Sequence, residues 1–309
     1  MKSIKIVANG MYLPKHKVLN EELSINLKLE NDYIYKRTGI EQRFFAENET
    51  IEELAIKSVI NMQENSKVNI NDIDMIIVAT TSTEKLMPGI SYLIQKEFKI
   101  KKCMCLDILA GCGGYINAFD IARNYIAIGK VKKALVIGVD VLSKYTDKND
   151  IGTYIILSDG AGATILESCN EKKGYFSYIE SNGEKGQILE CNLNKKIYMD
   201  GKEVYKYAVT DTVKNINELL KNSNENLDNI KYIIPHQSNI KIMKAIASRL
   251  KIDMSKMYAN IDKTGNTFCA SIPIVLSEMF EKKLLNDGDK IILLGYGGGL
   301  NTGTILLEV

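Results

Sequence analysis

The most constraining feature of this 309-residue sequence is that its second half repeats the pattern of its first half. Pairs of similar segments recur in the same order and at a nearly constant separation: residues 71–77 with 227–234, 80–83 with 236–239, 109–113 with 263–267, and 134–138 with 291–295. Single apolar strands often resemble one another by chance, but an ordered series of such pairs does not arise that way. We therefore expect two α/β halves related by pseudo-twofold symmetry and packed into one five-layer unit.

Apolar runs of strand length alternate with helical patterns along the chain, which is typical of an α/β fold. The strand runs carry Ile and Val on both faces, as strands buried between helix layers do. Strands are expected at residues 3–8, 75–80, 103–107, 134–139, 163–166, 232–235, 257–261, 290–294 and 304–307, and helices at residues 51–64, 91–98, 114–128, 204–220, 240–250 and 274–283.

The repeat divides the chain into an N-terminal half, residues 1–170, and a C-terminal half, residues 171–309. Residues 174–204 have no counterpart in the first half, and we expect them to hold the crossover between the halves and to shape a substrate tunnel. Two independent Rossmann-like domains are an alternative, but no Gly-x-Gly-x-x-Gly motif follows the first strand.

Charge and hydropathy argue against several classes of protein. The 40 basic and 38 acidic residues give a net charge of +2, which does not suit a general nucleic-acid binder. No stretch reaches the roughly 18–20 consecutive apolar residues that cross a bilayer, so we expect no membrane association. The N-terminal residues lack the apolar segment and cleavage site of a signal peptide, and we expect a cytoplasmic protein.

The six cysteines are expected to be free thiols, as is usual in the cytoplasm. Cys103 and Cys105 form a Cys-x-Cys pair in an apolar run, and the chain has only two histidines. We interpret this pair as buried strand residues and predict no metal site.

Cys112 is the first candidate for chemistry, because it follows an apolar strand and precedes the helical run 114–128. The positive end of the helix dipole and unpaired backbone N–H groups would stabilise its thiolate and lower the pKa of the thiol. The glycines on either side, Gly111, Gly113 and Gly114, permit a sharp strand-to-helix turn. A small apolar side chain that fills a tight turn is the alternative interpretation.

His236, Asn266 and residues 297–299 occupy comparable positions at strand ends, where open α/β sheets build their sites. His236 follows one predicted strand, and Asn266 stands where the repeat puts the counterpart of Cys112. The three glycines at 297–299 would let a backbone N–H approach an oxyanion. The alternatives are an inert histidine, a turn or N-cap asparagine, and a tight hairpin.

Together these segments resemble β-ketoacyl-acyl-carrier-protein synthase III, a condensing enzyme of the thiolase superfamily, over essentially the whole chain. Thiolases carry a second catalytic cysteine where this chain has Tyr296, and synthases I and II carry a second histidine where it has Asn266. Plant-type polyketide synthases share the Cys-His-Asn set, but the short length and the His-Gln-Ser-Asn sequence favour synthase III. The matching stretches are residues 37–40, 87–88, 107–114, 158–163, 235–239, 265–267, 270–273 and 297–299.

The resemblance implies a thiolase-like five-layer αβαβα fold, with the nucleophile in the first half and the His/Asn pair in the second. It implies that Cys112 carries the acyl group of a primer thioester, and that the N–H groups of Cys112 and Gly298 form the oxyanion hole. His236 and Asn266 would then stabilise the enolate that forms as malonyl-acyl carrier protein loses carbon dioxide. No cofactor is implied, since coenzyme A and phosphopantetheine thioesters are substrates, and the expected assembly is a homodimer.

The resemblance also suggests peripheral residues. Tyr33 and Ile151 stand where coenzyme A-dependent members have a tryptophan and an arginine that sandwich the adenine, while Arg37 is kept. The primer is therefore expected on coenzyme A with weakened affinity, or on acyl carrier protein. Met87 matches a residue that closes the partner subunit's acyl pocket; a core methionine is the alternative.

A basic rim for an acidic carrier protein is predicted at Lys206, Lys241, Lys244 and Arg249, with a merely solvated helix face as the alternative. Two other functions remain open at this point. One is a specialised paralogue in secondary metabolism that passes its acyl group to another nucleophile. The other is a non-catalytic scaffold of the same fold, which has no need of Cys112, His236 and Asn266 together.

Overall fold

The computed structural model describes residues 2–30, 32–192 and 196–309, and the first half of the chain contributes a five-stranded sheet. Its strand order is β1 (Ser3–Tyr12), β7 (Gly160–Cys169), β6 (Lys133–Asp140), β4 (Met75–Ala79) and β5 (Met104–Ile108). Strand β4 pairs in parallel with β5 and β6, whereas β7 pairs antiparallel with β6 and β1.

The second half contributes a four-stranded sheet with the same pattern of pairing. Its order is β11 (Tyr232–Pro235), β12 (Lys290–Gly297), β13 (Asn301–Glu308) and β8 (Tyr175–Ser181). Strands β11 and β12 are parallel, and β13 pairs antiparallel with β12 and β8. The order β11-β12-β13-β8 thus repeats β4-β6-β7-β1, which explains the paired segments in the sequence.

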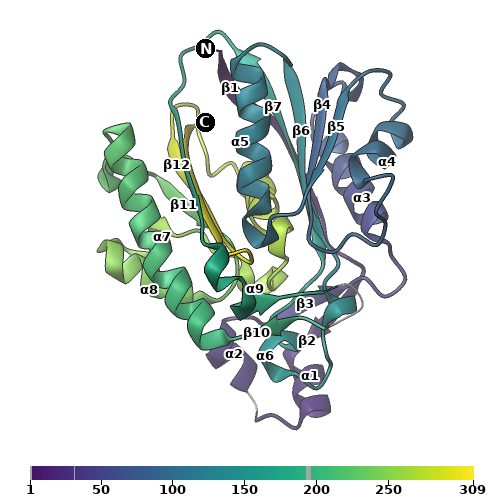
Figure 1. Ribbon diagram of the computed structural model, residues 1–309, viewed down its shortest axis with the longest axis vertical. Helices are drawn as coiled ribbons and strands as arrows, with labels where there is room; N and C mark the ends of the chain where they lie inside the picture. The colour runs from purple at the N-terminus through teal and green to yellow at the C-terminus, as the bar shows by residue number, and fades with distance from the viewer. Residues whose placement is uncertain (1, 31, 193–195) are drawn as a thin grey trace.

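Helices cover both sheets, and two of them lie between the sheets (Figure 1). The central helices are α5 (Gly114–Ala127) and α10 (Ser271–Glu281). Helices α3 (Ile51–Glu64) and α4 (Ile90–Glu97) cover the outer face of the first sheet, and α7 (Gly201–Ser223) and α8 (Ile240–Leu250) cover that of the second. The predicted five-layer αβαβα architecture is confirmed.

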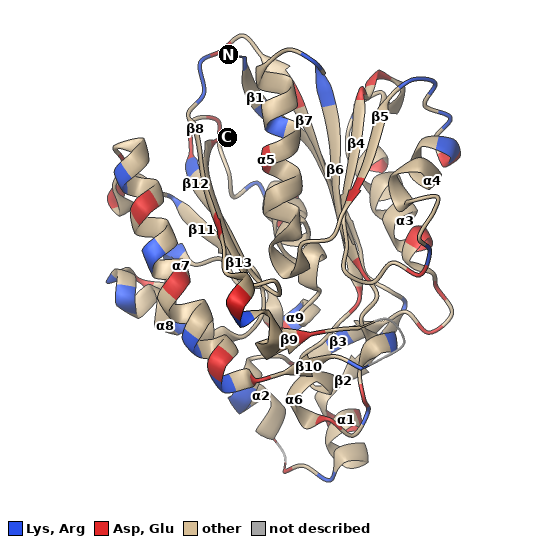
Figure 2. Cartoon of the chain, in the orientation of Figure 1, with Lys and Arg blue, Asp and Glu red and all other residues tan. Residues whose placement is uncertain are grey.

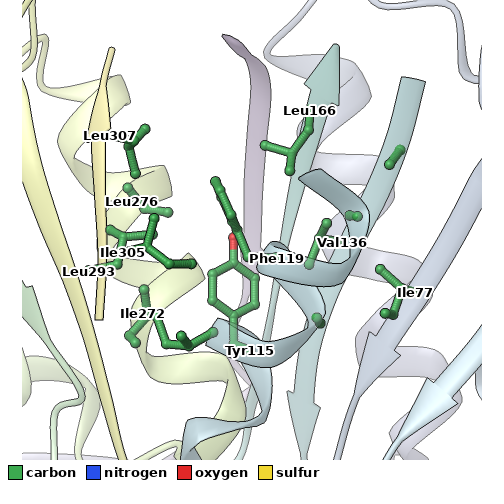
Figure 3. Close-up of a cluster of buried hydrophobic side chains, with 14 of the residues drawn as sticks. Ile77, Tyr115, Phe119, Val136, Leu166, Ile272, Leu276, Leu293, Ile305 and Leu307 are labelled. Carbon is green, nitrogen blue, oxygen red and sulfur yellow. The ribbon is translucent and has the colours of Figure 1, made fainter. Parts of the chain in front are cut away.

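The main core lies between the two sheets, around the aromatic side chains of α5 (Figure 3). Tyr115 and Phe119 are fully buried, and their rings meet edge to face with centroids 6.0 Å apart. The buried hydroxyl of Tyr115 donates to Thr164 Oγ1 of β7 at 2.7 Å, so it carries no unpaired donor into the core. Burying a side chain of this size stabilises the fold by roughly 2–3 kcal/mol.

Shorter elements gather at one end of the sheets, at the bottom of Figure 1. A small antiparallel β2–β3 pair and the β9–β10 pair contribute to this end. The elements are β2 (His16–Leu19), β3 (Gln42–Phe45), β9 (Leu189–Glu190), β10 (Tyr198–Met199), α1 (Asn20–Leu27), α2 (Tyr33–Thr38), α6 (Ile151–Tyr154) and α9 (Ile261–Thr264). Within the described ranges, no helix has the length and apolar character needed to cross a membrane.

One prediction about the second half is wrong. The strand expected at residues 257–261 is reduced to a single bridge between Met257 and Ile233, because α9 begins at Ile261. Residues 174–204, which have no counterpart in the sequence of the first half, include β8, which takes the place that β1 has in the first sheet. Strand β8 has no fully buried residue, whereas β1 has several, so the sequence of β8 does not show the apolar pattern of β1.

Candidate active site

Cys112 lies in the short 3-10 helix Gly111–Gly113 that joins β5 to α5. Gly111 has φ +55°, and a Cβ there would lie 2.5 Å from the carbonyl oxygen of Gly298, so a side chain at this position would collide with the second glycine loop. The Asn301 side chain ties the two loops together, since its Nδ2 donates to the Ala110 carbonyl at 2.5 Å. Cys112 is therefore held on backbone fixed from both halves of the molecule.

The sulfur of Cys112 is buried against the Gly297–Gly298 backbone. A Cβ at Gly297 would lie 2.7 Å from Cys112 Cβ and 2.8 Å from Cys112 Sγ. Burial, followed by the charge of Asp140, raises the pKa of the Cys112 thiol to about 12, and the backbone N–H groups of Gly298 and Cys112 oppose this rise. The predicted lowering of the pKa is wrong, because the loss of water on burial outweighs the effect of the helix terminus.

His236 follows β11, as predicted, and its imidazole is buried. Burial lowers its pKa to about 3, so the ring is neutral near pH 7. The Nδ1 atom lies 2.7 Å from Ser271 Oγ at the start of α10. If the serine hydroxyl donates, Nδ1 accepts and the proton of the neutral ring resides on Nε2, which is then free to donate to a ligand.

Asn266 follows α9 and lies beside Leu157 through a parallel bridge. Its N–H donates to the Ile156 carbonyl, and its carbonyl accepts from the N–H of Ser158. The side-chain oxygen accepts from the N–H of Phe268 at 3.0 Å. This bond sets the orientation of the amide, so Nδ2 is the end that remains for a ligand.

The three predicted catalytic residues line one cavity of about 550 Å³, although they come from segments far apart in the sequence. Arg37, Lys202 and Lys241 also line it and are exposed, so its opening is basic. Among its remaining lining residues are Leu157, Leu189, Ile197, Met199, Phe268 and Tyr296, so its interior is mainly apolar. The structure therefore brings a thiol, an imidazole and a side-chain amide together at an apolar chamber.

Of the substrate-binding residues predicted at Tyr33, Arg37 and Ile151, two lie outside the chamber. The Arg37 guanidinium sits 5.9 Å from the centroid of the Tyr33 ring, and Ile151 packs in the same hydrophobic cluster as Tyr33. Only Arg37 of these lines the cavity, while Gly152, the neighbour of Ile151, does so as well.

Met87 is 83% exposed, so the alternative of a core methionine is wrong. The four predicted docking residues are all exposed: Lys206 on α7, and Lys241, Lys244 and Arg249 on α8. Only Lys241 reaches the cavity opening. Acidic side chains alternate with basic ones along α7 (Figure 2), whereas α8 carries basic ones.

Sequence reasoning missed three residues of the site: Ser271, Tyr296 as a positioning residue, and Phe268. The Tyr296 hydroxyl lies 2.7 Å from Ser238 Oγ and donates to the His236 carbonyl at 3.3 Å. Its ring packs edge to face with the imidazole at 5.3 Å between centroids. Ser271 falls within the stretch 270–273 that carries the family resemblance, but no local pattern shows which side chain it contacts.

Metal ligation has no candidate among the described residues, since none of their His, Cys, Asp and Glu side chains form a group of three or more. The six cysteines are free thiols, as expected.

Comparisons with known proteins agree on one family. Residues 106–183 match the family model described as 3-Oxoacyl-[acyl-carrier-protein (ACP)] synthase III, and residues 220–309 match its C-terminal model. The β-ketoacyl-acyl-carrier-protein synthases III of Clostridium beijerinckii and Clostridium kluyveri are 38% and 37% identical, over 100% of both chains in each case. The crystal structure of the corresponding Aquifex aeolicus enzyme superposes with a TM-score of 0.96, at 34% identity over 99% of this chain and 100% of that one.

Proposed function

The chain belongs to the 3-oxoacyl-acyl-carrier-protein synthase III family, and from this membership we propose that it extends an acyl primer by a two-carbon unit in fatty acid biosynthesis. The observation that carries the proposal is the convergence of Cys112, His236 and Asn266 on one cavity. The reaction is a decarboxylative Claisen condensation that proceeds through an acyl-cysteine.

In the first half-reaction, Cys112 Sγ attacks the carbonyl carbon of a primer thioester. The developing oxyanion takes the hydrogen bonds that the N–H groups of Gly298 and Cys112 direct toward the sulfur. The bond between carbonyl carbon and donor sulfur breaks, and the thiol proton of Cys112 ends on the departing carrier thiol.

In the second half-reaction, malonyl-acyl carrier protein enters and its thioester oxygen accepts from His236 Nε2 and Asn266 Nδ2. The carbon–carbon bond to the carboxylate breaks, carbon dioxide leaves, and the electron pair becomes an enolate that these two donors stabilise, each by roughly 3 kcal/mol. The enolate carbon then attacks the acyl carbon on Cys112. The product leaves as a β-ketoacyl thioester, and the released Cys112 thiolate takes up a proton from water.

Intact-protein mass spectrometry tests the first step. Incubation with acyl-coenzyme A and acyl-carrier-protein donors is expected to add one acyl mass to the wild type and none to Cys112→Ala. Cys191→Ala, which removes an exposed thiol, is the matched control and should load normally. The proposal fails if no donor acylates Cys112. A loaded enzyme that releases no carbon dioxide from malonyl-acyl carrier protein would instead indicate transfer to another nucleophile.

We propose that the carrier protein docks on the face formed by Lys206, Lys241, Lys244 and Arg249. All four side chains are exposed, and Lys241 borders the cavity into which a phosphopantetheine arm would pass. The effect of charge is testable, since Lys244→Glu should raise KM for malonyl-acyl carrier protein several-fold and leave acylation by acyl-coenzyme A unchanged. If Lys244→Glu and the wild type have equal KM values for malonyl-acyl carrier protein, Lys244 is not part of the interface.

The proposed assembly is a homodimer, and the proposed compartment is the cytoplasm, where the free thiols stay reduced. Strand β5 lies at the edge of its sheet, and large apolar side chains near it are open to solvent: Leu86 is 88%, Met87 83% and Leu109 70% exposed. Such a patch on a sheet edge is unfavourable unless a partner covers it. Light scattering should give a dimer for the wild type and a monomer for Leu109→Asp; a monomeric wild type would refute the assembly.

A further inference from the structure

Phe268 occupies a place beside the nucleophile that the proposed reaction does not explain. It is 7% exposed and lines the cavity together with Cys112. Both residues belong to one apolar cluster, whose other buried members are Leu142, Leu157 and Ile197. Phe268 is the aromatic member of this buried set, and its ring meets that of His236 edge to face, with centroids 6.4 Å apart.

The backbone of Phe268 is in the left-handed region, with φ +48°. A bulky side chain seldom adopts this conformation, because its Cβ approaches the backbone, and surrounding structure must hold it there. The hydrogen bond from its N–H to Asn266 Oδ1 supplies that hold. Since glycine would meet the backbone geometry more easily, the ring itself is the feature of this position that needs an explanation.

The side of the nucleophile toward Phe268 is the apolar one. The Gly297–Gly298 backbone lies against Cys112 on the side of the proposed oxyanion hole, and the Gly298 N–H suits a carbonyl oxygen rather than a hydrocarbon chain. Leu157, Ile197 and Phe268 offer hydrocarbon surface, with Leu189 packed against the same cluster. An acyl chain attached to Sγ gains free energy by lying among these side chains.

We propose that Phe268 sets the length of the acyl group that Cys112 accepts and restricts it to short primers. This inference rests on the proposed function. The ring fills the volume into which a longer chain would extend from the sulfur. The Phe268 ring contacts the His236 ring on one side and packs in the Leu142–Leu157–Ile197 cluster on the other. It therefore has little room to turn away.

The test is the rate at which Cys112 is acylated by straight-chain thioesters from acetyl to decanoyl, offered on coenzyme A and on acyl carrier protein and followed by intact mass. The wild type is expected to load acetyl to butyryl groups at least about 10-fold faster than octanoyl. Phe268→Gly, which suits the positive φ, should raise octanoyl loading at least about 10-fold relative to acetyl. Phe268→Leu keeps an apolar side chain and should give an intermediate length profile. This variant provides the test if Phe268→Gly folds poorly.

Phe176→Leu is the matched control, because Phe176 lies on the partly exposed edge strand β8. Its length profile should equal that of the wild type. The inference is overturned if the wild type loads octanoyl as readily as acetyl, or if the folded Phe268 variants keep the wild-type profile. Failure of every donor to acylate wild-type Cys112 would overturn the proposed function itself, and the two results are distinguishable in the same measurement.

Discussion

The Nδ1 atom of His236 lies 2.7 Å from the Oγ atom of Ser271, and both residues are buried. A neutral imidazole carries one N–H, and the partner of one ring nitrogen decides which nitrogen bears it. Burial keeps His236 neutral by lowering its pKa to about 3. Ser271 is thereby a positioning residue, because its hydroxyl can direct the ring proton to Nε2 without touching the substrate.

Ser271→Ala should slow carbon dioxide release from malonyl-acyl carrier protein by about 5- to 100-fold, since it removes one buried hydrogen bond to the ring and with it the bias between tautomers. Acyl loading of Cys112 should change little. Ser277→Ala, six residues farther along α10, controls for loss of a hydroxyl from the same helix. Equal slowing of both half-reactions by Ser271→Ala would indicate a structural role instead.

His236→Ala and Asn266→Ala should separate the two half-reactions more sharply. Each variant removes one donor to the enolate oxygen, so decarboxylation should fall by about 100- to 1000-fold, while Cys112 still becomes acylated. Carbon dioxide release and intact mass, measured on the same samples, check this. If either variant abolishes acylation while it remains folded, that residue acts in the first step and the proposed division of roles is wrong.

The sequence predicts regular elements well where local signals agree. The helix expected at residues 51–64 has those bounds, because its apolar periodicity is reinforced by a capping box between Thr50 and Glu53. The helix at 240–250 likewise agrees with α8, which begins with the Asn239 cap. The strand expected at 257–261 failed because its apolar residues serve α9 and the core instead of a ladder.

Only the internal sequence repeat and the family resemblance predicted residues of the site. Cys112 and His236 follow strands, the repeat pairs Asn266 with Cys112, and the structure brings all three to one cavity. Ser271 and Phe268 could not be found in this way, since their roles depend on contacts between distant segments. The direction of the Cys112 pKa shift failed for a related reason: burial depends on the whole fold, whereas the helix N-terminus is visible locally.

Gly297→Ala should prevent acylation of Cys112. The added methyl group would lie 2.8 Å from Sγ, so the sulfur or the glycine loop must move, and overpacking of this kind costs about 1–3 kcal/mol. Acyl loading by intact mass and the melting temperature report the two effects separately. Gly183→Ala, whose Cβ would meet nothing within 4 Å, is the control. Normal loading of Gly297→Ala would show that the contact with Cys112 is not restrictive.

The buried histidine also predicts how stability depends on pH. Burial lowers the pKa of His236 from 6.5 to about 3, so below pH 6.5 the unfolded chain binds a proton that the folded chain does not. Protonation then favours the unfolded state, and the contribution of this group to stability falls as the pH drops from about 6.5 toward 3. Between pH 8 and pH 5 the loss is about 2 kcal/mol.

His236→Gln removes this contribution, so its unfolding free energy should fall by about 2 kcal/mol less than that of the wild type between pH 8 and pH 5. Urea unfolding at one fixed protein concentration measures both, and the other titrating groups cancel in the comparison. His16→Gln removes the other histidine, which lies in contact with Glu47, and should leave the His236-dependent loss in place. Identical pH dependence of the wild type and His236→Gln would mean that the imidazole is hydrated or charged in the folded protein, and the neutral Nε2–H donor assigned to the condensation step would have to be abandoned.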